Sequence, residues 1–219
     1  MKEFNIDLII FDLDGTLIDS KKDIAFSVNE TFRKMGINQL PEETIYGYVG
    51  NGVRPLIDRT LTAAGKENSI SQAVEHFRSI YIDHLLDTTV MFGGVAEALE
   101  SFKNRKKMAI ASNKPYRYVE KILKGLGMDD FFESVKGGDS VEMKKPAPEM
   151  LQSIMKEVSI SDPKNAVFVG DSGVDIRTGK NANVMTIGVT YGFRSRQEVE
   201  ENEPDAIIDS PTELMDILR

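Results

Sequence analysis

Chemically useful side chains gather in four short polar segments, each of which lies beside a hydrophobic run or a predicted helix. The segments are Asp12-Leu13-Asp14-Gly15-Thr16, Ser112-Asn113-Lys114, Lys144-Lys145-Pro146-Ala147-Pro148 and Gly170-Asp171-Ser172-Gly173-Val174-Asp175. Carboxylates that share one site repel each other unless a cation lies among them, and Mg²⁺ prefers hard oxygen ligands. We therefore predict that Asp12 and Asp171 bind Mg²⁺. Lys145, or Lys144 in the alternative register, would place a second positive charge beside a phosphoryl group.

The first segment offers both a nucleophile and a proton carrier for phosphoryl transfer. An aspartate carboxylate can attack phosphorus to give an aspartyl-phosphate, and Asp12 is the candidate for this role. The leaving oxygen needs a proton and the water that attacks later must lose one, so a second carboxyl group at Asp14 can act as general acid and then as general base. A turn or a helix cap is the alternative role for both acids, but two carboxyl groups at a buried strand end are costly unless they have a function.

Four further residues are supporting candidates. Asp175 would complete the metal site, although an acid in the first turn of a helix is also favoured by the helix dipole alone. Ser112 can hold phosphate at a helix N-terminus, a role that is compatible with simple capping. Asn113 and Lys114 follow it directly and are candidates for the same phosphate site.

The elements that must position these residues alternate between strand and helix along the chain. Short apolar runs predict strands at residues 6–11, 108–111, 166–169, 185–189 and 206–208. Amphipathic spacing predicts helices at residues 95–102, 118–126 and 149–158. The alternation indicates an α/β fold with a doubly wound, mostly parallel, Rossmann-like sheet. Ligands of such sheets bind outside the carboxyl ends of the strands, where the four polar segments would lie.

The stretch from residue 20 to residue 88 breaks this alternation. It holds no clear strand and reads as several helices with regularly spaced apolar residues. We predict a helical cap domain at 17–88, inserted after the first strand of a catalytic core formed by 1–16 and 89–219. Within the cap, Asn51, Gly52 and Arg54 are predicted to contact substrate, with Arg54 pairing with a substrate carboxylate. The alternatives are a plain connecting turn and an Arg54 on the outer helix face.

Composition narrows the class of partner. A formal net charge of −8 disfavours binding to nucleic acid and to anionic membranes, so a small ligand is expected. The absence of cysteine excludes disulfides, Cys-ligated metals and thiol nucleophiles. The first apolar run is too short for a signal peptide or a membrane span, which predicts a cytoplasmic protein. A monomer and a homodimer are both open.

Taken in order, the four segments resemble the signature of the haloacid dehalogenase-like superfamily, which reads DxDxT, then Ser or Thr, then Lys-Pro, then GDxxxD. The resemblance implies that Asp12 is the nucleophile and Asp14 the acid–base residue. It implies phosphate binding by Ser112 and Lys145, with Thr16 of the first motif beside the substrate. Asp14 also distinguishes the chain from the dehalogenase and phosphonate-cleaving branches, which lack that second carboxylate.

For the metal, the same resemblance implies Mg²⁺ held by Asp12, by the backbone carbonyl of Asp14 and by Asp171. Asp175 is implied to lie in the outer shell of the ion. The helical insertion resembles the C1 cap of this family. These expectations cover nearly the whole chain, because the motifs run from residue 12 to residue 175.

Several segments resemble phosphoglycolate phosphatases in particular. They are Asp-Gly-Thr-Leu-Ile-Asp-Ser at 14–20, Tyr-Val-Gly-Asn-Gly at 48–52, Ser-Asn-Lys-Pro at 112–115, Gly-Gly-Asp-Ser at 137–140 and Val-Thr-Tyr-Gly-Phe at 189–193. The alternatives are a pyrophosphatase, a nucleotide or sugar-phosphate phosphatase, and a mutase of the β-phosphoglucomutase type. A non-enzymatic phospho-accepting receiver domain is the remote alternative, since receivers lack both the large insertion and the second acid.

Overall fold

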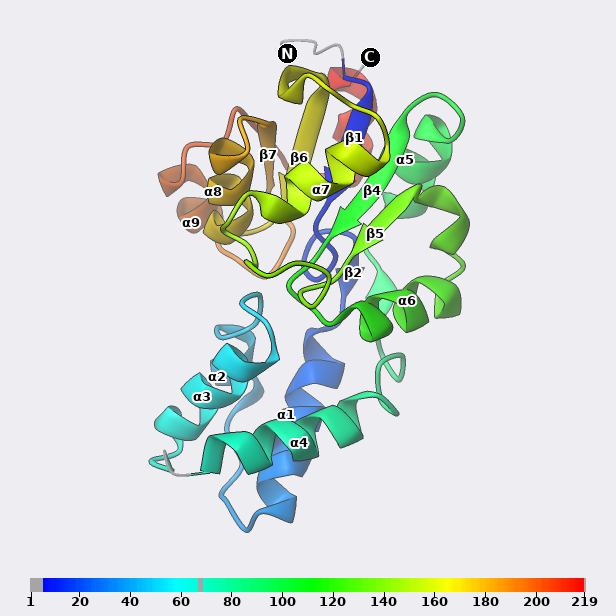
Figure 1. Cartoon of the computed structure of the whole chain (residues 1–219). Coiled ribbons are helices and arrows are strands. Elements are labelled where there is room, and N and C mark those ends of the chain that lie inside the picture. The colour runs from blue at the N-terminus through cyan, green and yellow to red at the C-terminus, as the bar shows by residue number, and fades with distance from the viewer. Residues whose placement is uncertain (1–5, 67–68, 219) are drawn as a thin grey trace.

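The computed structural model describes residues 6–66 and 69–218, so the ends of the predicted core and two residues of the predicted cap lie outside the described part. One part of the molecule is a six-stranded sheet with helices on both faces, and the other is a group of helices facing one end of that sheet (Figure 1). The strands of the large sheet are β1 (Leu8–Phe11), β4 (Lys107–Ala111), β5 (Ser134–Lys136), β6 (Ala166–Gly170), β7 (Met185–Val189) and β8 (Ala206–Ile208).

The large sheet has the strand order β5-β4-β1-β6-β7-β8, and every neighbouring pair is parallel. Ile10 at the centre of β1 aligns with Ala109 of β4 on one side and with Phe168 of β6 on the other. All four residues of β1 are buried, as expected of a central parallel strand covered on both faces. The predicted doubly wound α/β fold is confirmed.

Alternate residues of β1 enter two separate hydrophobic clusters, as the two-residue period of a strand requires. Leu8 and Ile10 belong to a cluster that contains the buried side chains of α7, whereas Ile9 and Phe11 belong to one that contains α5, α6 and α10. The helices of this part are α5 (Val95–Phe102), α6 (Tyr116–Gly125), α7 (Glu149–Glu157), α8 (Gly173–Asn181), α9 (Arg196–Glu201) and α10 (Leu214–Ile217).

The sequence prediction missed one strand of the sheet, β5 at the edge. This strand has three residues, and Val135 is its single apolar side chain, so no hydrophobic run marks it. It forms because its backbone pairs with β4, with Val135 opposite Ile110. Tertiary pairing has decided the outcome here, because a three-residue window carries too little local signal.

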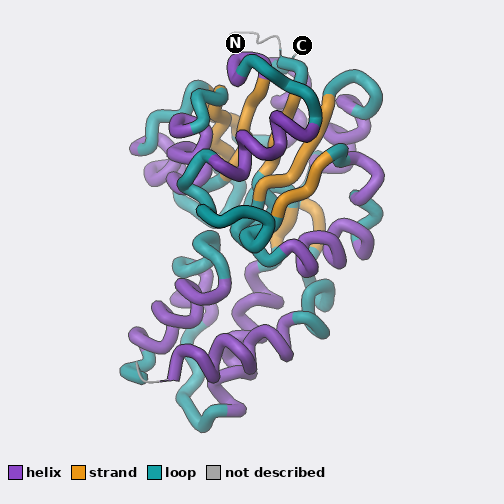
Figure 2. The backbone as a smooth tube through the Cα atoms, viewed as in Figure 1, coloured by secondary structure: helices purple, strands orange, loops and turns teal. Residues whose placement is uncertain are grey.

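In its described residues, 17–66 and 69–88, the insertion contains four α-helices. Figure 2 shows helices grouped beyond one end of the sheet. They are α1 (Lys21–Lys34), α2 (Glu42–Tyr46), α3 (Val53–Ala63) and α4 (Ile70–Tyr81). A short antiparallel pair, β2 (Ile18–Asp19) and β3 (Val90–Met91), joins the segment that leaves the core to the segment that returns. Just inside this pair, the carboxylate of Asp23 accepts hydrogen bonds from the backbone N–H groups and hydroxyls of Thr88 and Thr89. These hydrogen bonds therefore link the segment that leaves the core to the segment that returns to it.

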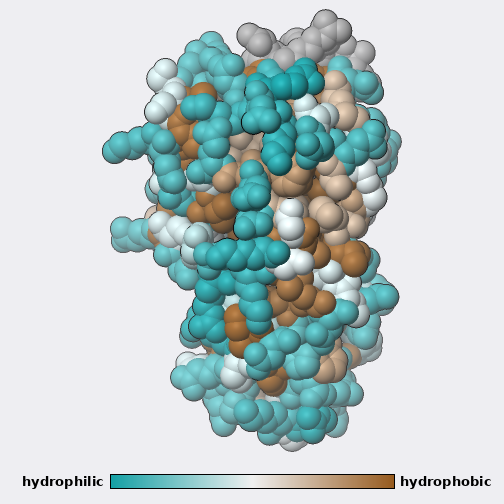
Figure 3. Space-filling view, turned by 90° about the vertical axis from the view of Figure 1, so that its right-hand side faces the viewer, coloured by the Kyte–Doolittle hydropathy of each residue, from teal (hydrophilic) through white to brown (hydrophobic). Residues whose placement is uncertain are grey.

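The surface agrees with the charged composition. Figure 3 shows hydrophilic side chains over most of one face, with hydrophobic patches near the middle of the molecule and others in the upper part of the view. Within the described residues, no helix is both long enough and apolar enough to cross a membrane.

Candidate active site

Three of the four polar segments follow neighbouring strands of the sheet. Asp12 comes after β1, Ser112 after β4 and Asp171 after β6, and these strands are adjacent in the order β4-β1-β6. The backbone N–H of Asp12 donates to the carbonyl of Val169 over 2.9 Å, so pairing continues to the first residue of the site. Parallel strands end at one edge, and the three segments consequently meet there.

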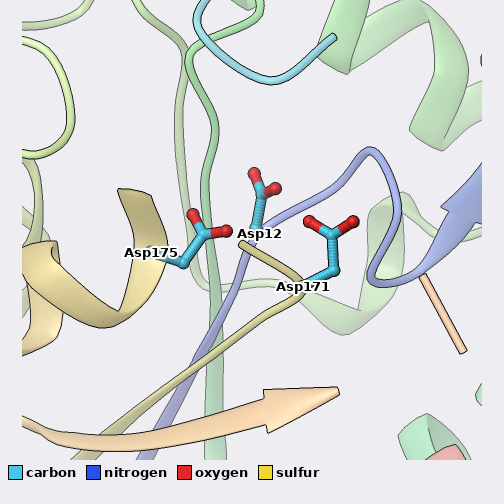
Figure 4. Close-up of side chains that lie close together, drawn as sticks. All are labelled: Asp12, Asp171 and Asp175. Atoms are coloured by element: carbon cyan, nitrogen blue, oxygen red, sulfur yellow. The ribbon is translucent and has the colours of Figure 1, made fainter. Parts of the chain in front are cut away.

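Three aspartates form a compact acidic cluster at this edge (Figure 4). Asp12, Asp171 and Asp175 each offer a carboxylate oxygen within 4.8 Å of the others, and all three side chains are buried. Asp175 reaches the cluster from the first turn of α8, where it forms a capping box with Ser172. Figure 4 shows the three carboxyl groups gathered beyond the end of β1.

Gly15 lets the first loop pass close to this cluster. Its φ of +86° lies in the left-handed region, and a Cβ at this position would fall 2.2 Å from Oδ2 of Asp171. No residue with a side chain fits there without displacing the carboxylate. The glycine after the second aspartate is thus required both by its left-handed backbone conformation and by the approach of Asp171.

Lys145 lies between two of the acids. Its Nζ donates to Oδ1 of Asp12 over 2.8 Å and to Oδ1 of Asp175 over 2.7 Å. Burial opposes the charge of the ammonium group, but Asp12 and Asp175 outweigh this effect and raise the pKa of Lys145. The lysine is therefore charged, whereas the neighbouring Lys144 is exposed. The structure places Lys145 rather than the alternative Lys144 among the acids.

The acidic cluster suits a divalent cation. Burial, followed by repulsion from Asp175, raises the pKa of Asp12 to about 7 although Lys145 lowers it. Burial, followed by the charges of Asp175 and Asp12, raises the pKa of Asp171 well above its ordinary value. One Lys145 cannot balance three carboxylates, and buried oxygens with excess negative charge are the donor set that Mg²⁺ prefers. The residues present fit the ion that the sequence implies.

Hydrogen bonds distinguish the three acids as ligands. Asp175 uses Oδ1 for Lys145 and Oδ2 for the N–H and hydroxyl of Ser172, so both of its oxygens are engaged. Asp171 accepts the backbone N–H of Phe193 at Oδ2 over 2.7 Å, and Asp12 accepts Lys145 at Oδ1. Asp12 and Asp171 each keep an oxygen without a hydrogen bond from the described residues. This pattern favours Asp12 and Asp171 as direct ligands and Asp175 as a residue that positions Lys145.

The second acid of the first segment belongs to a different network. Oδ1 of Asp14 accepts hydrogen bonds from Ser20 over 2.5 Å and from Nζ of Lys114 over 2.7 Å. Lys114 also donates to the hydroxyl of Tyr81, in the last turn of α4, over 2.6 Å. Burial opposes the charge of Lys114, but Asp14 and Tyr81 outweigh it and raise the pKa of the lysine. The Asp14 carboxylate is not one of the three in the acidic cluster, and its network extends to the helical insertion. Binding of the metal by the backbone carbonyl of Asp14 stays a prediction.

A cavity that is partly open to solvent lies between the two parts of the molecule, with a volume of about 40 Å³. A single water needs roughly 10–15 Å³ on this measure, so the cavity has room for a small group. Its core side holds Asp12, Asp14, Ser112, Asn113 and Lys114, and apolar side chains of the insertion cover the opposite side. Reactive groups thus face a small, largely apolar chamber.

Two other predicted site residues, Gly52 and Asn113, line the cavity. A Cβ at Gly52 would lie 3.2 Å from the carbonyl oxygen of Asn113. Asn113 directs its amide to the backbone of Lys145, accepting from the N–H over 3.1 Å and donating to the carbonyl over 3.2 Å. It also donates to the carbonyl of Gly50 over 3.3 Å. Asn113 therefore positions the loop of Lys145 and contacts the insertion.

Three predicted substrate residues do not line the cavity. Thr16 is fully buried, its carbonyl accepts the hydroxyl of Tyr191 over 3.1 Å, and its own hydroxyl has no partner within the described structure. When the side-chain amide of Asn51 is turned so that its oxygen faces Arg59, that oxygen accepts hydrogen bonds from the guanidinium group. Arg54 is exposed near the start of α3. Substrate contacts by these three residues stay predictions.

Sequence reasoning missed two residues that connect the core to the insertion. Tyr81 is buried on the apolar face of its helix, and its hydroxyl contacts Lys114 in the active site. Arg194, after β7, donates to the backbone carbonyls of Gly47 and Val49 in the insertion. A tyrosine on the apolar face of a helix indicates a polar contact, because a buried hydroxyl needs a hydrogen-bond partner. The sequence around Arg194 gives no comparable indication of its contacts.

The chain matches the family model described as haloacid dehalogenase-like hydrolase over residues 9–189. Among curated relatives, a phosphoglycolate phosphatase of Psychrobacter arcticus is 36% identical, with 96% of this chain and 95% of that protein covered. A phosphoglycolate phosphatase of Haemophilus influenzae is 35% identical, covering 96% of this chain and 97% of the relative.

Solved structures agree over the same length. The crystal structure of a predicted phosphoglycolate phosphatase from Haemophilus somnus has a TM-score of 0.90 at 30% identity and covers 96% of this chain and 97% of that one. The crystal structure of a predicted phosphatase from Clostridium acetobutylicum has a TM-score of 0.84 at 25% identity, with 98% of each chain covered. The family model, the full-length relatives and the shared fold together show that this chain belongs to the haloacid dehalogenase-like hydrolases.

Proposed function

We propose that the protein is a Mg²⁺-dependent phosphatase that hydrolyses phosphoglycolate, with Asp12 as the covalent nucleophile. The observation that carries the proposal is the position of Asp12. This carboxylate lines the cavity, contacts Lys145 and belongs to the acidic cluster, while Asp14 stands two residues away on the insertion side. A nucleophile, a cation and a separate proton carrier are thus arranged around one small chamber.

The reaction follows from these positions. The free carboxylate oxygen of Asp12 attacks phosphorus, the bond from phosphorus to the ester oxygen breaks, and Asp14 gives its proton to the departing oxygen. Ser112 and Lys145 donate hydrogen bonds to the phosphoryl oxygens as their charge develops. Water then attacks the aspartyl-phosphate, with Asp14 accepting its proton, which releases phosphate and restores Asp12. Bound Mg²⁺ would neutralise the repulsion between the Asp12 carboxylate and the anionic phosphoryl group.

The helical insertion acts in this proposal as a cap over the core. Its loop contacts Asn113 through the carbonyl of Gly50, and its last helix contacts Lys114 through Tyr81. Burial of the reacting groups excludes water that would compete with the intended nucleophile. The division into a core at 1–16 and 89–219 and a cap at 17–88 is part of this proposal, as are a cytoplasmic location and a monomer or homodimer.

The choice of phosphoglycolate rests on the relatives of that name and on the small cavity. Phosphate release is measured for phosphoglycolate, pyrophosphate, nucleoside monophosphates and hexose phosphates, each with Mg²⁺ or with excess EDTA. We expect the highest kcat/KM for phosphoglycolate and loss of turnover in EDTA. Equal rates in the chelator would refute metal dependence, and a preference for another member of the panel would reassign the substrate.

The nucleophile is tested by Asp12→Asn, with Asp58→Asn on the exposed side of α3 as the matched control. We expect Asp12→Asn to abolish turnover of every substrate and Asp58→Asn to retain the wild-type rate. Rapid acid quench and peptide mass spectrometry of the wild type should find phosphate on the peptide that contains Asp12. Phosphate on another residue, or turnover by Asp12→Asn, contradicts the assignment.

A further inference from the structure

The cavity has a second polar end, away from the acidic cluster. It is formed by Lys114 from the core and Tyr81 from the insertion, whose Nζ and hydroxyl oxygen lie 2.6 Å apart. Both residues line the cavity and both are buried, with exposures of 7% for Lys114 and 2% for Tyr81. Among the described residues that line the cavity, Lys114 is the one with a positively charged side chain.

This pair has unused hydrogen-bond donors. An ammonium group has three N–H donors, and within the described structure those of Lys114 are directed at Asp14 and Tyr81, which leaves one. The Tyr81 hydroxyl accepts from Lys114, so its own hydrogen is available to a further acceptor. A charged donor and a neutral donor therefore stand side by side at one end of an otherwise apolar chamber.

We propose that Lys114 and Tyr81 form the subsite for a carboxylate on the substrate, with Lys114 binding one oxygen and Tyr81 the other. The proposal rests on the proposed phosphatase function and names the residues that give it specificity. A carboxylate offers two acceptor oxygens at a spacing that suits two adjacent donors. Apolar neighbours such as Ile24, Val53 and Phe77 offer it no competing donor and reduce screening by water.

The distance to the reacting centre suits a two-carbon acid. In phosphoglycolate one methylene separates the ester oxygen from the carboxylate. Asp14, which would protonate that ester oxygen, lies 2.7 Å from Nζ of Lys114. A substrate held with its ester oxygen at Asp14 would consequently bring its carboxylate within reach of Lys114, whereas a longer acid would need a larger chamber.

The location of Tyr81 would couple carboxylate binding to the contact between the insertion and the core. Because Tyr81 ends α4 and Lys114 follows β4, a carboxylate bound by both residues would bridge the insertion and the core. A substrate without this group would lose that bridge as well as the direct hydrogen bonds. Selectivity should then be expressed in kcat/KM for carboxylate-bearing esters over neutral esters of equal size.

The test compares phosphoglycolate with ethyl phosphate, which has the same ester linkage and no carboxylate. We expect Lys114→Met to lower kcat/KM for phosphoglycolate about 10- to 100-fold more than for ethyl phosphate, as loss of a charged hydrogen bond predicts. Tyr81→Phe should lower the same ratio about 3- to 10-fold. Lys22→Met and Tyr116→Phe, at exposed positions outside the cavity lining, are the matched controls and should leave the ratio unchanged.

The outcomes separate this inference from the function on which it rests. Equal losses for both substrates would show that Lys114 acts only through Asp14, and would overturn the carboxylate subsite while leaving the phosphatase intact. A wild type that shows no preference for phosphoglycolate over ethyl phosphate would overturn it as well. A wild type that hydrolyses neither ester refutes the proposed function itself. Tyr81→Phe, which removes one oxygen atom, keeps the test decisive if Lys114→Met does not fold.

Discussion

Replacing Asp171 by asparagine should stabilise the metal-free protein while abolishing its activity. Asp171 is a buried acid beside Asp12 and Asp175, and its neighbours and its burial both raise its pKa. Folding therefore requires a carboxyl group to lose hydration next to like charges. Asparagine keeps an oxygen to accept the N–H of Phe193, now 2.7 Å from Oδ2, and removes the charge.

The magnitude follows from the spacing of the cluster. Two unit charges 4.8 Å apart interact by about 3.5 kcal/mol at an effective dielectric constant of 20. Asp171 faces two acids, and Lys145 compensates for one of them. We therefore expect Asp171→Asn to raise the free energy of unfolding by about 2–3 kcal/mol at pH 8 in EDTA, or Tm by roughly 5–10 °C for a chain of this size.

The assay is urea and thermal unfolding of wild type, Asp171→Asn and the exposed control Asp58→Asn, each in EDTA and in Mg²⁺. Wild type and Asp58→Asn should gain stability from Mg²⁺, and Asp171→Asn should gain little, because it lacks a ligand. Phosphatase activity of Asp171→Asn should fall at least about 100-fold. A variant that is less stable than wild type in EDTA, or that is stabilised by Mg²⁺ as strongly as wild type, would refute the reasoning.

Three further predictions use neighbouring contacts. Lys145→Met leaves Asp12 without its buried cation and should cost about 3–5 kcal/mol in EDTA, measured by urea unfolding, a change opposite in sign to that of Asp171→Asn. Burial raises the pKa of Asp12 to about 7, so the stability that this residue contributes is present below about pH 4 and is lost as pH rises through about 7. Above that pH the ionised carboxylate is available to a cation. The gain in Tm from Mg²⁺ should therefore be larger at pH 8 than at pH 5.5. Asp23→Ala removes the acceptor that links the two segments joining the insertion to the core, and should lower the free energy of unfolding by about 2–4 kcal/mol in urea. A decrease below about 0.5 kcal/mol would show that these hydrogen bonds do not stabilise the fold.

The sequence predicted the convergence of the acids because that convergence follows from topology alone. Once β1 and β6 were assigned as parallel strands, Asp12 and Asp171 had to meet at their carboxyl ends. Helix α5 was predicted with the bounds that the structure has, since its apolar spacing is regular and its ends are marked. Local pattern and global fold agree in these elements, and prediction from pattern succeeds there.

Contacts between the insertion and the core could not be predicted in the same way. The partner of Lys114 depends on how α4 is rotated and where it docks, and periodicity gives the buried face of a helix but not the reach of one hydroxyl. Asn113 shows the same limit: its position after β4 did not indicate that its amide would bind the backbone of Lys145. Phosphate binding by Asn113 stays a prediction. Strand order fixes which loops meet, and side-chain geometry then decides what each residue does within them.

The charges buried around the cavity connect metal and substrate binding. The four buried acids of the candidate site, Asp12, Asp14, Asp171 and Asp175, stand against its two buried lysines, Lys114 and Lys145, which gives a formal sum of −2. A divalent cation would bring this sum to zero, whereas a phosphate ester alone would make it more negative. Coupling between two ligands is reciprocal, so the site should bind Mg²⁺ more tightly with phosphate present and phosphate more tightly with Mg²⁺ present. Under the proposed mechanism, Lys145 would offset the acids of the metal site and bind the phosphoryl group, and Lys114 would face the organic part of the substrate.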